Sequence, residues 1–86
     1  MYLLNYMKLK ILTFGIARDI VEGKEIEVEL REGANVADLK ALLFNLYPEF
    51  ERLASFAIAV NEAYRDDEYI LSEGSEIVIV PPVSGG

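Results

Sequence analysis

The segment Glu25–Leu30 alternates strictly between glutamate and an aliphatic residue, and no other stretch constrains the fold as strongly. Successive side chains of a β-strand point to opposite faces, so this pattern predicts a strand with one buried and one solvated face. The three glutamates are interpreted as the solvated face. A metal site on this flat strand is disfavoured, because nothing else in the sequence completes a coordination sphere.

Three further segments alternate in a similar way, and each predicts a strand. Residues 7–14 place Leu9 and Ile11 on one side, with Lys10 and Phe14 on the other. Residues 56–60 and 76–80 give two more strands, and Pro81 ends the last of them. A brief strand is expected near Tyr64, after a turn at Asn61.

One helix of about three turns is predicted between Asn35 and Pro48. Asn35 is suited to cap its start, Asp38 places a carboxylate near the positive helix end, and Pro48 stops it. Its apolar side chains recur at helical spacing: Val36, Leu39, Leu43, Leu46 and Tyr47. Residues 16–23 and 49–54 are expected to be short connections with some helical character. The result is an α+β fold with a sheet of about four to five strands and one main helix on one face.

Composition excludes several classes of function. The 86 residues make one domain and include no cysteine and no histidine, so a disulfide scaffold, a thiolate metal site and a conventional active site are disfavoured. The net charge of -7 argues against nucleic acid binding and suggests a basic protein partner, although solubility alone explains it equally well. No run is long enough for a membrane span, and the apolar start has no signal-peptide pattern.

The chain ends in Gly85-Gly86, carried on the segment Pro81-Pro82-Val83-Ser84. Terminal glycines contribute little to a folded core, because glycine loses the most backbone entropy and buries no side chain. A glycine end can enter a narrow site and present its carboxylate for chemistry, whereas the simpler interpretation is a frayed terminus. The two prolines hold the base of this tail extended.

Several segments together resemble one family, the small subunits of molybdopterin synthase, which are ubiquitin-like β-grasp sulfur carriers. The matching segments are 14–18 (Phe-Gly-Ile-Ala-Arg), 32–36 (Glu-Gly-Ala-Asn-Val), 60–64 (Val-Asn-Glu-Ala-Tyr), 71–77 (Leu-Ser-Glu-Gly-Ser-Glu-Ile) and 81–86 (Pro-Pro-Val-Ser-Gly-Gly). The last is the most specific of them. Residues 1–6 have no counterpart in the family, and Ser75 stands where it often has Asp. We therefore expect an extension at 1–6, a β-grasp domain at 7–80 and an extended tail at 81–86.

The resemblance implies that Gly86 is the reactive end of the protein. In the family, an ATP-dependent, E1-like activating enzyme adenylates this carboxylate, and sulfur delivery then gives a thiocarboxylate. The loaded carrier docks on the large subunit, which supplies the catalytic side chains, in a heterotetramer. There it donates sulfur to a cyclic pyranopterin monophosphate precursor. The resemblance thus implies a non-catalytic, cytoplasmic sulfur-donor subunit without a metal or a tightly bound cofactor.

Strand parity predicts a docking face on the open side of the sheet. Phe14 and Val80 fall on the side away from the core, and exposed apolar side chains there favour a partner. The family resemblance adds Tyr64 to this face and places Arg18 near it. Three alternatives stay open: a carrier of the thiamin branch, a modifier conjugated to protein lysines through Gly86, and a simple interaction module.

Overall fold

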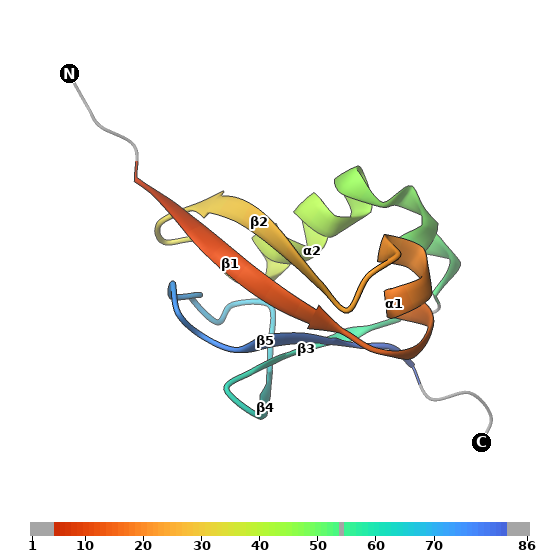
Figure 1. Cartoon of the computed structure of the whole chain (residues 1–86). Helices are drawn as coiled ribbons and strands as arrows, with labels where there is room; N and C mark the ends of the chain where they lie inside the picture. Colours follow the sequence, from red (N-terminus) through yellow and green to blue (C-terminus); the bar gives the residue numbers. More distant parts are fainter. Residues whose placement is uncertain (1–4, 54, 83–86) are drawn as a thin grey trace.

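The computed structural model describes residues 5–53 and 55–82 and contains a five-stranded sheet with helices on one face (Figure 1). The elements in chain order are β1 (Tyr6–Thr13), α1 (Gly15–Val21), β2 (Glu25–Arg31), α2 (Val36–Leu46), the 3₁₀ helix η1 (Pro48–Arg52), β3 (Ala57–Val60), β4 (Ala63–Arg65) and β5 (Ile77–Val80). No helix among the described residues has the length and apolar character needed to cross a membrane.

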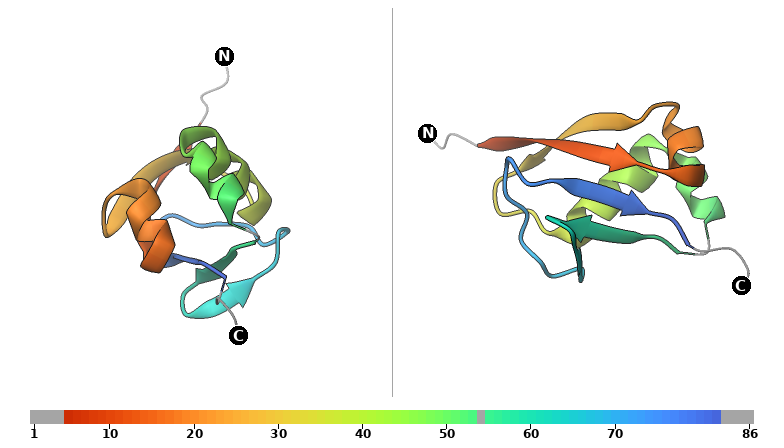
Figure 2. Two further views of the ribbon diagram at one scale, coloured as in Figure 1. Left: turned by 90° about the vertical axis from the view of Figure 1, so that its right-hand side faces the viewer. Right: turned by 60° about the horizontal axis from the view of Figure 1, so that its bottom comes forward.

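The strands lie in the order β2-β1-β5-β3-β4, so the last strand occupies the middle of the sheet. β1 and β5 pair in parallel, whereas the other three pairings are antiparallel. The first two strands form an antiparallel hairpin, with Leu9 opposite Val28. The predicted mixed α+β architecture is therefore confirmed, with the helices and the sheet forming two layers (Figure 2).

The core lies between the sheet and α2. Each predicted alternation is found, since the inward side chains of the strands are buried or half-buried and their neighbours are more exposed. The fully or almost fully buried side chains include Leu9, Ile11, Ile58, Val60, Ile77 and Ile79 from the sheet, and Val36, Leu39, Leu43 and Phe50 from α2 and η1. Burying one such side chain contributes about 1.5–3 kcal/mol, and the sum of these contributions opposes the conformational entropy lost on folding.

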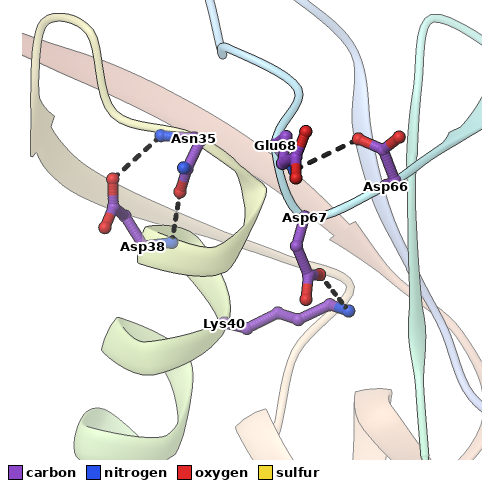
Figure 3. Close-up of polar contacts among 6 residues, drawn as sticks. All are labelled: Asn35, Asp38, Lys40, Asp66, Asp67 and Glu68. Carbon is purple, nitrogen blue, oxygen red and sulfur yellow. Dashed lines mark hydrogen bonds and ion pairs between the residues drawn. The ribbon is translucent and has the colours of Figure 1, made fainter.

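The start of α2 is closed by a reciprocal capping box, shown in Figure 3. The Asn35 side chain accepts a hydrogen bond from the Asp38 N–H, and the Asp38 carboxylate accepts one from the Asn35 N–H, both at 2.9 Å. The loop before β5 completes the cap, because the carbonyls of Tyr69 and Asp67 accept from the Val36 and Ala37 N–H groups. The predicted helix start and the stop before Pro48 are both confirmed.

Two local features differ from the sequence prediction. The segment after Phe14 forms a defined helix, α1, where a connection with some helical character was expected, because Ala17 is fully buried against the core. β1 begins at Tyr6, one residue before the predicted strand, and Tyr6 pairs with Arg31 of β2. The carbonyl of Asn5 also accepts a hydrogen bond from the Glu32 N–H at 2.9 Å, which continues the hairpin.

Candidate functional site

The face of the sheet that the helices leave uncovered carries an apolar patch. In the right-hand view of Figure 2, β1, β5 and β3 lie in front of the helices. We define the apolar patch as the contiguous outward apolar side chains of these three strands and of β4, together with Phe14, the residue after β1. Its members are Leu12, Phe14, Ala57, Ala59, Tyr64, Val78 and Val80. All of these side chains are exposed or half-buried.

The strand register places the patch residues side by side. Val78 of β5 lies between Leu12 of β1 and Ala59 of β3, and Ala59 lies opposite Tyr64 of β4. Directly opposed residues on one face have Cβ atoms about 4.5–5.5 Å apart, so these four residues form a continuous row across four strands.

A second row runs parallel to the first, one step further along the strands. Val80 lies opposite Ala57, and the parallel pairing of Thr13 with Ile79 brings the next residue, Phe14, beside Val80. Ala57 and Ala59 have short side chains, so a partner can approach the sheet backbone closely in the middle of the patch.

Three of the four predicted docking residues lie on this patch. Phe14 is 57% exposed and Tyr64 is 71% exposed, whereas Val80 is half-buried between its neighbouring strands. Arg18 lies outside the patch, on α1, with an exposed side chain. Its position four residues after Phe14 places it one helical turn from the edge of the patch. The partner-binding role of all four stays a prediction.

Leu12, Val78 and the two alanines were not singled out from the sequence as docking residues. Their alternation already placed them on the outward side, but the sequence alone does not show which strands are neighbours. The central position of β5 joins these separate segments into one surface.

The base of the predicted tail follows β5 directly. Sheet pairing ends at Val80, and Pro81 has no N–H with which to continue it. Pro81 is half-buried and Pro82 is exposed. The other predicted tail residues, Val83, Ser84, Gly85 and Gly86, lie outside the described residues.

The rest of the outer face is charged. Lys8 and Lys10 of β1 lie opposite Glu29 and Glu27 of β2, and all four are exposed, as the solvated-face interpretation predicted. The outer face is thus apolar over β5, β3 and β4 and mostly hydrophilic over β1 and β2, where Leu12 and the exposed Tyr6 are the exceptions. Among residues 5–53 and 55–82, no group of three or more acidic side chains is arranged to hold a metal ion.

The acidic loop at residues 66–68 makes structural contacts. Asp67 forms an ion pair with Lys40 of α2 at 2.8 Å, and Asp66 accepts a hydrogen bond from the Glu68 N–H at 3.1 Å. Figure 3 shows both contacts beside the start of α2. The carboxylates of Asp66 and Asp67 thus order the loop that caps this helix.

This mixed sheet with one main helix across it defines a ubiquitin-like β-grasp protein. A ubiquitin from Caldiarchaeum subterraneum has the same fold, with a TM-score of 0.65 at 18% identity over 95% of this chain and all of that one. The chain belongs to the ThiS family, whose model matches residues 11–86.

Several similar proteins are sulfur carrier subunits of molybdopterin synthase. A molybdopterin synthase sulfur carrier subunit from Chlamydomonas reinhardtii is 32% identical over 93% of this chain and 100% of that protein. The resemblance inferred from the sequence is therefore confirmed.

Two solved structures agree with this. A putative molybdopterin converting factor subunit 1 from Pyrococcus furiosus has a TM-score of 0.81 at 30% identity, covering 90% of this chain and 99% of that one. A chain from the complex of subunits 1 and 2 of the molybdopterin-converting factor from Helicobacter pylori has a TM-score of 0.65 at 26% identity, covering 93% of this chain and all of that one.

Proposed function

We propose that this protein is a sulfur carrier in the biosynthesis of the molybdenum cofactor. The observation that carries the proposal is that Pro81, the base of the tail, directly follows Val80 of the apolar patch. The chain also covers the whole length of a relative that is a sulfur carrier subunit. A tail that begins at the edge of an unpartnered apolar face can be directed into a partner that covers this face.

The proposed reaction takes place at the Gly86 carboxylate in two steps. The carboxylate first attacks the α-phosphorus of ATP on an E1-like activating enzyme, which releases pyrophosphate and leaves an acyl adenylate. A sulfide-level sulfur donor then attacks the acyl carbon and displaces AMP, which leaves a thiocarboxylate. Adenylation supplies the leaving group that a free carboxylate lacks.

The loaded carrier then donates its sulfur within molybdopterin synthase. We propose that the apolar patch docks on the large subunit, and that the tail reaches a cyclic pyranopterin monophosphate in the active site of that subunit. The solved complex of subunits 1 and 2 from Helicobacter pylori supports such a pairing. This chain then contributes the reacting terminus, and the large subunit contributes the catalytic side chains.

The intact mass of the chain tests this function. After incubation with the activating enzyme, ATP and a sulfur donor, the mass is expected to rise by the difference between one sulfur and one oxygen atom. A variant that lacks Gly86 is the matched control, and it is expected to unfold at the same temperature and to show no gain. An unchanged mass of the full chain, or a gain in the truncated chain, contradicts the proposal.

Two related functions use the same terminus. A modifier would form an isopeptide bond between Gly86 and a protein lysine, which an immunoblot reports as a ladder of covalent adducts. A carrier of the thiamin branch would donate sulfur to a different acceptor. Sulfur transfer from the purified thiocarboxylate to the pterin precursor, with the large subunit present, separates the proposed function from both.

A further inference from the structure

Gly15 and Pro81 lie against each other where the first and last strands separate. β1 and β5 pair in parallel as far as Thr13 and Ile79. Phe14 is still extended, and Gly15 then turns the chain into α1, while β5 ends at Val80 and is followed directly by Pro81. A Cβ atom placed on Gly15 would have Pro81 Cγ as its nearest neighbour outside the adjoining residues, at 3.6 Å.

Two properties of Gly15 make this contact specific. Its φ of +56° lies in the left-handed region, which L side chains rarely adopt. The 3.6 Å separation is an ordinary van der Waals contact for a methyl group, so a longer side chain has to displace the proline ring or turn away from it. Glycine therefore leaves open the small space between its Cα atom and the ring of Pro81.

Pro81 is suited to transmit this contact to the tail. Its ring fixes φ near −65° and removes the N–H that could continue the sheet. Pro81 is half-buried, in contrast to the exposed Pro82, as expected for a ring packed on the domain. When the Pro81 ring is held in this position, it sets the direction in which the chain leaves the sheet.

We propose that Gly15 is a positioning residue for the C-terminal tail, and that the close approach of Pro81 to Gly15 aims the tail at the active site of the activating enzyme. The inference rests on the proposed function, because aiming is useful to a tail that reacts at its end. Gly15 itself lies outside the tail and outside the apolar patch.

A small rotation at Pro81 has a large effect at the end of the chain. The five residues 82–86 can reach at most about 18 Å, at about 3.3–3.6 Å per residue. A rotation of about 20° at their base then moves the end by about 6 Å. A partner that receives a loosely aimed tail has to order it on binding, which weakens binding and leaves the chemical step unchanged.

The variant Gly15→Asn tests the proposal, with Gly74→Asn as its matched control. Asparagine tolerates the left-handed region better than most residues. Gly74 also has a positive φ, +88°, but a Cβ there meets no atom within 4 Å. Both variants therefore carry a backbone penalty, and only the first disturbs Pro81.

The first measurement is ATP–pyrophosphate exchange by the activating enzyme, with the carrier as the varied substrate. Gly15→Asn is expected to raise the KM for the carrier by about fivefold and to leave kcat unchanged, which is the size expected for ordering one or two more residues on binding. Pro81→Ala is expected to do the same. The double variant is expected to be no worse than either single one, because both remove one contact.

The second measurement uses the free carrier and is independent of its reaction. NMR is expected to show nuclear Overhauser effects between the Gly15 α-protons and the Pro81 ring, and a lower ¹H–¹⁵N heteronuclear effect at the Val83 amide in Gly15→Asn than in Gly74→Asn. Equal KM values for the two asparagine variants, additive effects, or no contact between Gly15 and Pro81 overturn the proposal. If the wild-type carrier gains no sulfur, the proposed function fails and the NMR result alone decides the contact.

Discussion

Asn61 and Glu62 form the tightest turn of the sheet. They link β3 to β4 as a two-residue hairpin, and both have positive φ values, 51° and 68°. This geometry is that of a type I′ turn, in which asparagine is favoured first and glycine second. Asn61 also binds Glu76 next to β5, donating its N–H to the carbonyl at 2.8 Å and accepting from the Glu76 N–H at 3.0 Å.

Glu62→Gly is expected to stabilise the protein by about 0.5–1 kcal/mol, because glycine adopts the left-handed region without a Cβ clash. The midpoint of urea denaturation measures this change. Glu25→Gly on β2 is the control, since the same substitution at an exposed strand position is expected to destabilise by a similar amount. A loss of stability in Glu62→Gly would show that the glutamate side chain contributes more to the turn than its backbone strain costs.

At the scale of the element, the start of α2 is stabilised both by its own residues and by a loop that is distant in the sequence. Its own residues supply the capping box of Asn35 and Asp38, and the distant loop supplies the carbonyls of Asp67 and Tyr69. The free N–H groups at the helix start are thus satisfied from two sources that lie far apart in the chain.

Asn35→Ala is expected to destabilise the protein by about 1 kcal/mol through loss of the cap. Asn45→Ala makes the same chemical change at an exposed position inside the same helix, where alanine has the higher helix propensity. The control is therefore expected to be neutral or slightly stabilising. Thermal and urea denaturation of the two variants measure the difference, and equal effects would contradict the importance of the cap.

The sequence predicts α2 and the alternating strands well, because local signals mark them. Asn35 and Pro48 are boundary residues, and strict alternation identifies the buried faces. α1 is less clear from the sequence, since its seven residues are too few for a helical pattern and the core contact of Ala17 decides its structure. The apolar patch was predicted at Phe14, Tyr64 and Val80, but its full extent depends on strand order, which no local pattern encodes.

At the scale of the whole molecule, the two faces of the sheet differ in their environment, because one is buried in the core and the other is exposed. The inner face is buried under α2 and holds the fold together. The outer face contributes the apolar patch and the base of the tail, so substitutions there are expected to change binding more than stability.

Phe14→Ala and Val80→Asp are expected to weaken binding to the synthase large subunit by tenfold or more, about 1.4 kcal/mol, the size found for the few interface residues that dominate binding. Isothermal titration measures this affinity. Leu46→Ala on α2 is the control, because Leu46 is 51% exposed, close to the 57% of Phe14, but lies on the helix layer. Thermal denaturation checks that each variant is folded, and unchanged affinity in folded Phe14→Ala and Val80→Asp would exclude the outer face as the docking surface.

The central position of β5 also dictates when the protein can become functional during its synthesis. The middle strand of the sheet is the last to be translated, and until it is made β1 and β3 have no strand to join them. Pairings between distant parts of the chain are slow to form, because the entropy cost of closing the long intervening loop comes first. Pro81 directly follows β5 and lies close to Gly15 of α1, so it reaches this position only after β5 has joined the sheet. An activating enzyme that depends on this geometry would therefore select for folded carriers before any ATP is consumed.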